Sequence, residues 1–449
     1  MYAASFWLIR QRLNFVCLPN IANGHSMQFF RGTNPVRLNS LKNMFRGLRY
    51  RNYRYYFFGQ SISLIGTWVQ NIAMSWLVYR LTGSALLLGT VVFAQQIPAL
   101  FITPFAGVLA DRWNRRRVII TTQAIAMATT LFLAWMVLSN RISVPWIIAI
   151  AIVNGVILAF DSPFRHAFVQ DIITKPEDLA NAIALNSSLY NLARFIGPPI
   201  GGFLINLVGE GWCFLINGIS FMGVLSGLLY VRIEEAKKKE HSGSILFQLI
   251  EGIRYAWNFR SLRYLLLLII FSSFFGLPFQ ALMPLFAADI LKGDAQMLGF
   301  LTGSLGAGAL TGALYLASRK YLMKVPKLTY HTSLIFSIGL AVFALSPYRW
   351  LSMPALVVTG FGMIVHFNGT NTLLQSISDR EKRGRIVSLY SLTFLGITPL
   401  GSLAAGALAD YLGVPATVFA FSLVCLVSAL LFGRRVRLIM FSLARRLRE

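Results

Sequence analysis

The most constraining feature of this sequence is a series of long stretches without a charged residue. A helix needs about 20 apolar residues to cross the ~30 Å hydrocarbon core of a bilayer. Eleven charge-free runs approach or exceed that length, and a twelfth stretch, about 180–207, is interrupted only by Arg194. They predict twelve membrane-spanning helices, six on each side of a polar segment at 232–263. The charge-free runs are 55–79, 81–110, 118–140, 142–160, 211–231, 264–288, 295–318, 328–348, 350–378, 386–409 and 411–433.

The composition agrees with a helical membrane protein. Hydrophobic residues make up 56% of the chain and charged residues 13%, whereas a soluble domain carries about 25% charged residues. A membrane β-barrel would instead show short segments of alternating polarity, and these are absent from the sequence. We therefore expect an all-α, multi-pass protein of the cell membrane.

The basic residues predict the orientation of these spans. A net charge of +25 is typical of nucleic-acid partners when the charge forms one patch. Here 36 of the 41 lysines and arginines fall on one side of the predicted spans and four on the other, which is the positive-inside pattern. Both termini are thus predicted to be cytoplasmic. The counter-charge is expected to be anionic lipid, and no nucleic-acid partner is expected.

The chain divides into five predicted segments. The linker opens with a polar patch and continues as an amphipathic stretch in which Ile245, Leu249, Ile253 and Trp257 recur every four residues, as in an interfacial helix. The N-terminal extension is rich in arginine and lacks acidic residues, which is also typical of organellar transit peptides. We favour the interpretation that it is an overlong reading frame with a working start at Met27 or Met44. The segments are a poorly ordered extension at 1–43, a six-helix bundle at 44–231, the cytoplasmic linker at 232–263, a second six-helix bundle at 264–433 and a basic tail at 434–449.

The two predicted bundles also look duplicated. Three glycines of the first bundle recur in the second in the same order, shifted by 204 residues. Two six-helix halves joined by a cytoplasmic linker are typical of transporters built from parallel repeats. The glycine pairs are Gly197 and Gly401, Gly202 and Gly406, and Gly209 and Gly413.

The loop after the second predicted helix reads GVLADRWNRRR at residues 107–117. Glycine permits close backbone approach, and Asp111 is suited to a neighbouring helix N-terminus or to an arginine. The loop resembles motif A of the major facilitator superfamily, GxLaDrxGrkr, with Asn114 in place of a frequent glycine. Because asparagine tolerates the left-handed conformation nearly as well, we expect this departure to have no consequence. The resemblance implies the major-facilitator fold and a cytoplasmic gate formed by Gly107, Asp111, Arg112, Arg115, Arg116 and Arg117.

The fifth predicted helix carries RFIGPPIGG at residues 194–202. Small residues let a neighbouring helix approach closely, and the two prolines remove backbone donors and bend the helix. Helix packing alone accounts for this pattern. In the fifth helix, however, it resembles motif C of the same superfamily, which is associated with antiport and therefore implies efflux. The residues concerned are Gly197, Pro198, Gly201 and Gly202.

A narrower resemblance covers about residues 44–433. Residues 53–85, 160–172 and 251–267 are similar to the bacterial enterobactin-exporter-like, or transmembrane secretion effector, branch of the superfamily. This branch includes siderophore and macrolide exporters. The resemblance implies a small amphipathic substrate and a place in the bacterial cytoplasmic membrane.

The residues that couple transport are harder to predict. A charge in mid-helix costs about 2.5–3.5 kcal/mol, so Arg194 is expected to face a cavity or a buried partner. It is either an anion-contacting or proton-relay residue, or a structural bridge to carbonyls or to Asp161. We expect Asp161 to meet both Arg112 and Arg194, either titrating during transport or, as we favour, locking the gate. The first predicted helix carries no carboxylate, so proton coupling through that helix is not supported.

Polar residues inside the predicted spans complete the set of candidates. His366 is either a relay or ligand contact or a hydrogen-bonded packing residue, and packing is the commoner role of a lone histidine. The other candidates for coupling or substrate contact are chosen by their mid-helix position. They are Gln70, Asn71, Gln95, Asn154 and Gln280.

Together these patterns favour a secondary-active exporter of a drug- or siderophore-like molecule, working by alternating access with protons as the coupling ion. The alternative is a non-transporting membrane scaffold or an accessory to secretion, which would not need Arg194 and polar faces within the membrane. The sequence contains no paired carboxylates, nucleophile–base set or phosphate loop, and its three cysteines lack metal or disulfide spacing. We therefore expect no enzyme activity, no cofactor and no metal.

Overall fold

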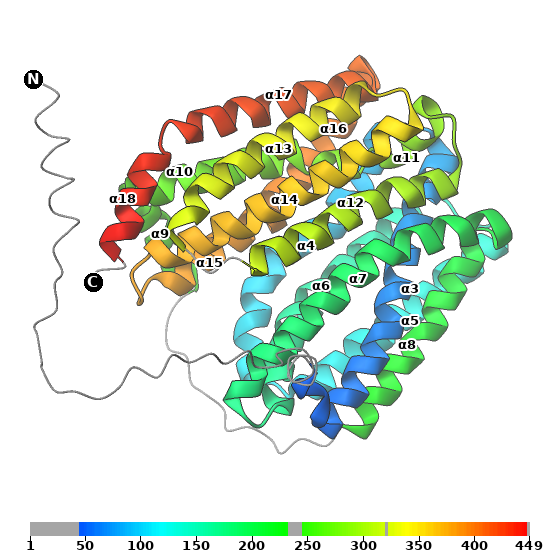
Figure 1. Ribbon diagram of the computed structural model, residues 1–449. Helices are drawn as coiled ribbons and strands as arrows, with labels where there is room; N and C mark the ends of the chain where they lie inside the picture. Colours follow the sequence, from blue (N-terminus) through cyan, green and yellow to red (C-terminus); the bar gives the residue numbers. More distant parts are fainter. Residues whose placement is uncertain (1–44, 232–244, 319–321, 447–449) are drawn as a thin grey trace, which may run out of the picture. The chain divides into compact units, whose positions relative to one another are not determined.

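The computed structural model describes residues 45–231, 245–318 and 322–446. The predicted N-terminal extension and the polar patch of the linker lie outside these ranges. Every regular element within them is a helix (Figure 1). Up to residue 231 the elements are η1 (Arg46–Arg49), α3 (Arg51–Thr82), α4 (Ala85–Arg112), α5 (Arg115–Leu138), α6 (Val144–Ile172), α7 (Pro176–Val208) and α8 (Glu210–Tyr230).

The second half contains more interrupted helices. Its seventh predicted span breaks into short α, 3-10 and π segments around Pro278, because proline cannot donate a backbone hydrogen bond. The elements are α9 (Ile245–Asn258), α10 (Arg260–Phe271), η2 (Ser272–Gly276), η3 (Pro278–Gln280), α11 (Met283–Leu285), η4 (Phe286–Ile290), α12 (Ala295–Ala317), η5 (Leu322–Lys324), α13 (Val325–Leu345), α14 (Arg349–Ile377), α15 (Arg383–Leu392), η6 (Thr393–Ile397), α16 (Thr398–Leu412), α17 (Val414–Gly433) and α18 (Val436–Arg446).

Ten helices in the described ranges are long and apolar enough to cross a membrane, against the twelve expected from the charge-free runs. The other two predicted spans correspond to α3 and α7. These helices have 32 and 33 residues, so their length suffices for a ~30 Å core at 1.5 Å per residue. They are more polar than the ten, since α3 carries Gln60, Gln70 and Asn71 and α7 carries Asn191 and Arg194.

The duplication expected from the glycine spacing has a counterpart in the backbone. Gly209 links α7 to α8 with φ 85° and ψ 170°, and Gly413 links α16 to α17 with φ 82° and ψ 156°. Both conformations are open to glycine and strained for other residues. Helix pairings recur as well: α4–α6 and α5–α8 in the first half correspond to α12–α14 and α13–α17 in the second. The same packing scheme is therefore used twice.

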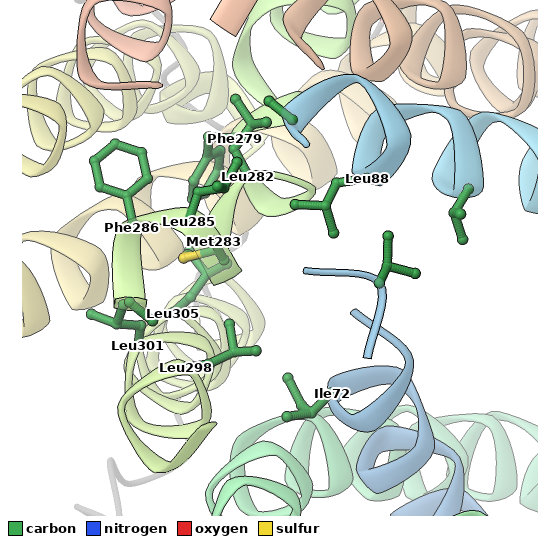
Figure 2. Packing of buried hydrophobic residues seen from close by; sticks show 14 of the residues in the cluster. Ile72, Leu88, Phe279, Leu282, Met283, Leu285, Phe286, Leu298, Leu301 and Leu305 are labelled. Carbon is green, nitrogen blue, oxygen red and sulfur yellow. The ribbon is translucent and has the colours of Figure 1, made fainter. Parts of the chain in front are cut away.

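In the described ranges, buried apolar side chains form three clusters, which differ between the two ends of the helices. We call the end where α4 begins and α16 ends the outer end, and the end where α4 ends and α15 begins the inner end, after the predicted orientation. The outer cluster joins both halves, with Ile72 and Leu88 from the first and Leu282, Met283 and Leu298 from the second (Figure 2). At the inner end each half has a separate cluster instead.

The linker helix α9 and the last helix α18 cover the inner end of the second half. Glu251 of α9 forms an ion pair with Arg385 of α15, and the Tyr255 hydroxyl accepts a hydrogen bond from the Asp379 N–H at 3.2 Å. Burial raises the pKa of Tyr255 above 10.0, so the phenol stays protonated at neutral pH. The amphipathic helix expected in the linker is present, with Trp257 exposed on its other face.

Candidate transport pathway and gates

Two helix pairs, each with one helix from either half, close the outer end. The first pair is α4 and α16. The Asp410 carboxylate accepts hydrogen bonds from the Ala85 N–H at 3.1 Å and the Leu86 N–H at 3.4 Å. The backbones touch nearby, since a Cβ atom added at Gly406 would lie 3.0 Å from the Leu86 Cα. A Cβ atom at Gly89 would likewise meet the Ser402 carbonyl. Such close approach is typical of helix packing in lipid, where van der Waals contact replaces the hydrophobic effect.

A second pair, α7 and α12, closes the same end. A Cβ atom at Gly202 would lie 2.9 Å from the Gln296 Cα, and one at Gly299 would lie 2.6 Å from the Pro198 carbonyl oxygen. By contrast, Gly201 faces α3, where its Cβ would lie 3.1 Å from the Val69 Cα. The candidate motif C therefore serves two interfaces. Gly202 and Pro198 contact the other half, and Gly197 and Gly201 pack within their own.

Two polar contacts reinforce the outer closure. The Tyr79 hydroxyl donates to Asp289 at 2.6 Å, and the Asn206 amide donates to Asp294 at 2.6 Å. Each contact joins the first half to the second. Hydrogen bonds to a charged acceptor are shorter and stronger than neutral ones.

At the inner end, the candidate motif A makes its described contacts within the first half. Arg115 lies 3.3 Å from Asp111 and 2.7 Å from Asp171. Arg116 donates to the Leu228 carbonyl at the end of α8 at 2.8 Å, while Arg112 and Arg117 are exposed. A Cβ atom added at Gly107 would meet nothing in the described chain within 4 Å.

The Asn114 position differs from our expectation. Its φ is −67° and its ψ 105°, so it is not left-handed. Its side chain instead accepts a hydrogen bond from the Arg117 N–H at 3.0 Å and caps the N-terminus of α5. Asparagine is a favoured N-cap residue, and the expected tight turn is therefore held by a cap.

Asp161 also has a different partner from the one we expected. It pairs with Arg165 of the same helix at 2.7 Å, and it accepts hydrogen bonds from Thr122 at 3.1 Å and Gln123 at 2.9 Å. Arg165 follows Asp161 by four residues and therefore lies on the same helix face. The expected contacts of Asp161 with Arg112 and Arg194 are not formed.

Arg194 lies partly buried between α7 and α3. Its guanidinium lies 5.9 Å from the centre of the Trp68 ring, within the range of a cation–π contact. Tyr190 packs against the same indole, with ring centres 5.9 Å apart. No carboxylate in the described ranges pairs with Arg194. The predicted bridge to Asp161 is therefore replaced by an aromatic contact.

The remaining candidates separate into buried and accessible side chains. Gln70 is buried in the first half, where its carbonyl oxygen accepts from Thr130 at 3.1 Å and Asn217 at 2.5 Å. His366 is fully buried, and its Nε2 lies 3.0 Å from the Ser272 hydroxyl, as expected of a packing residue. By contrast, four candidates keep solvent-accessible surface: Asn71, Gln95, Asn154 and Gln280.

Sequence reasoning missed the acidic residues of the outer end. Asp289, Asp294 and Asp410 all connect the two halves. A signal was available for one of them, because GALAD at 406–410 repeats GVLAD at 107–111 with one change. In the described part of the chain no three His, Cys, Asp or Glu side chains are grouped as a metal site.

Comparison with known proteins assigns the chain to a family. Residues 43–444 match the model described as transmembrane secretion effector. The protein belongs to this family of the major facilitator superfamily. It is therefore a multi-pass membrane transporter, as the motifs implied, and not an enzyme. The family match gives no support to the scaffold alternative.

Relatives of this transporter include a siderophore transporter and a multidrug efflux pump. It is 24% identical over 389 residues to the staphyloferrin A transporter of Staphylococcus aureus, covering 85% of this chain and 96% of the relative. It is 28% identical over 384 residues to the multidrug efflux pump Tap of Mycobacterium tuberculosis, covering 82% and 89%. A bacterial homologue of the human lysosomal transporter Spinster, solved in an inward-facing, unoccupied conformation, shares the fold with a TM-score of 0.63 and 15% identity, covering 88% of this chain and 98% of the homologue.

Proposed function

We propose that this transporter is a secondary-active exporter of a small amphipathic organic molecule, drug- or siderophore-like. It works by alternating access and exchanges its substrate for protons across the bacterial cytoplasmic membrane. The functions of its relatives, siderophore transport and multidrug efflux, support this substrate class.

One observation carries the alternating-access part of the proposal. The outer apolar cluster contains residues of both halves, whereas each inner cluster belongs to one half. Two halves that are joined at one end and separate at the other resemble the closed and open sides of a rocking transporter. The described conformation then corresponds to a state open toward the cytoplasm.

The topology in this proposal has twelve spans with both termini in the cytoplasm. Helices α3 and α7 are the two spans beyond the ten apolar helices. They lie at the interface between the halves and can therefore be more polar. Residues 44–231 and 264–433 form the two rocking bundles, linked by 232–263. The basic loops support this orientation through the positive-inside rule.

For coupling we propose the buried pair of Asp161 and Arg165. The two side chains are 12% and 18% exposed, and protonation of Asp161 would remove the charge that holds Arg165. For substrate contact we propose Arg194, which together with Trp68 and Tyr190 offers a cationic and aromatic surface to an amphipathic molecule. His366 acts in packing in this proposal.

The proposal is tested by transport in inverted membrane vesicles. An imposed proton gradient, acidic inside, should drive uptake of a compound chosen from siderophores, macrolides and cationic drugs, and a protonophore should stop it. Asp111→Asn should lower the rate without preventing insertion. If purified protein in proteoliposomes moves no member of this panel under any gradient, the antiporter proposal fails.

Thiol accessibility tests the scaffold alternative separately. Cysteines placed at Gln95 and Asn154, which lie on α4 and α6, should react with a water-soluble maleimide if they line a hydrated pathway. A solvent-shielded pair would favour the scaffold. Buried Gln70→Cys serves as the matched control, because its side chain is enclosed within the first half.

A further inference from the structure

Two copies of one short sequence lie at opposite ends of the same helix pair. GVLAD occupies residues 107–111 near the end of α4, and GALAD occupies 406–410 near the end of α16. The outer contacts show that the helices run antiparallel, since Ala85 at the start of α4 meets Gly406 near the end of α16. Asp111 and Asp410 therefore mark the inner and the outer end of one interface.

Each of these carboxylates is unfavourably placed within its own helix. A negative charge near a helix C-terminus opposes the helix dipole, whereas the N-terminus of a neighbouring helix attracts it. Asp410 makes this favourable contact. Its carboxylate accepts from the N–H groups of Ala85 and Leu86 and from the Ser84 hydroxyl, at 3.1, 3.4 and 3.4 Å.

At the inner end of this helix pair, the backbones are not in close contact at Gly107 and Gly384. Gly107 lies on the same face of α4 as Gly89 and Leu100, because the residues are separated by nearly whole helical turns. Gly89 packs against Ser402 and Leu100 against Gly396, but a Cβ at Gly107 would meet nothing within 4 Å in the described chain. Gly384, at the start of α15, is equally open.

We propose that Asp410 is a positioning residue for transport. It holds the outer end of α4 and α16 closed by accepting hydrogen bonds from the first N–H groups of α4, beside the N-cap residue Ser84. This inference rests on the proposed alternating access and adds which contact stabilises the outward-closed state. Loss of Asp410 therefore favours opening at the outer end and closing at the inner end.

The test measures thiol labelling at both ends of the interface. Ala405, 1% exposed, becomes the outer reporter as Ala405→Cys, and Thr103→Cys on the inner half of α4 becomes the inner one. The three native cysteines are replaced by serine. Right-side-out and inverted vesicles then expose the two reporters in turn to a membrane-impermeant maleimide.

Asp410→Ala should raise the labelling rate of the outer reporter about tenfold and lower that of the inner reporter. The variant removes three hydrogen bonds from the start of α4 to a charged acceptor, while Ser84 still caps the helix. Asp410→Asn should give a smaller change and Asp410→Glu should restore most of the closure. The control Glu381→Gln alters an exposed carboxylate and should change neither rate. Asp410→Asn also replaces Asp410→Ala if the alanine variant fails to insert.

Unchanged labelling in all three Asp410 variants would overturn the proposal, as would a rise at both ends, which indicates general loosening. Substrate transport by the parent protein is measured in the same vesicles. If the parent transports while the variants label normally, only the role of Asp410 fails. If the parent itself never exposes Ala405→Cys during transport, alternating access fails.

Discussion

The two ends of the interface between the halves are packed differently, although both carry glycines and aspartates. At the outer end, glycines bring backbones together, three aspartates bridge the halves and one apolar cluster spans both. At the inner end, the described contacts of motif A stay within the first half, and each half closes its own cluster. Closure therefore depends on backbone approach and a few charge-assisted hydrogen bonds, both of which are readily reversed.

The largest effect, on thermal stability, is expected from the ion pair of Asp161 and Arg165 in the first half. Asp161→Asn leaves Arg165 without its charged partner, and removing one member of a buried pair costs about 3–5 kcal/mol. We expect a clearly lower midpoint of thermal unfolding in detergent.

The double variant Asp161→Asn with Arg165→Gln provides the control. It removes both charges, so part of the lost stability should return. A single variant as stable as the parent would contradict the importance of this pair.

A smaller effect is expected from breaking the outer closure directly. In Gly202→Ala the new methyl would lie 2.9 Å from the Gln296 Cα, and overpacking of this kind costs about 1–3 kcal/mol. We expect labelling of Ala405→Cys from the outside to rise about tenfold or more. Gly223→Ala is the matched control, since its methyl would lie 3.7 Å from the nearest atom, the Gly59 carbonyl oxygen. Equal labelling in the two variants would show that close helix approach does not set the closure.

The smallest effect is expected from one polar bridge. Tyr79→Phe removes the hydrogen bond to Asp289, which is worth about 1 kcal/mol, and should raise outer labelling about fivefold. Tyr411→Phe, a change at an 89% exposed side chain, should have no effect. If both substitutions act alike, the Tyr79 contact does not contribute to closure.

The sequence predicted elements better than it predicted partners. Charge-free runs predicted the ten apolar helices found in the described ranges, because desolvating a charge dominates insertion. The glycines of the candidate motif C are closely packed as expected, whereas Gly107 of motif A is not. The partner of Asp161 was wrong because charges were matched across helices, whereas Arg165 lay one turn away. Asn114 was judged by backbone tolerance rather than by its capping side chain. The contacts of Asp410 could not be predicted, because they depend on the pairing of α4 with α16, which no local sequence pattern specifies.

Distances between spin labels test whether the two ends of the protein open and close in turn. One pair, Trp113→Cys with Ser388→Cys, spans the inner end, and another, Leu81→Cys with Tyr411→Cys, spans the outer end; the four positions are solvent-accessible. In lipid nanodiscs, double electron–electron resonance should give a long inner and a short outer distance. A transported substrate or Asp410→Ala should shorten the inner distance and lengthen the outer one. Two pairs that lengthen together, or that never change, would contradict alternating access in this protein.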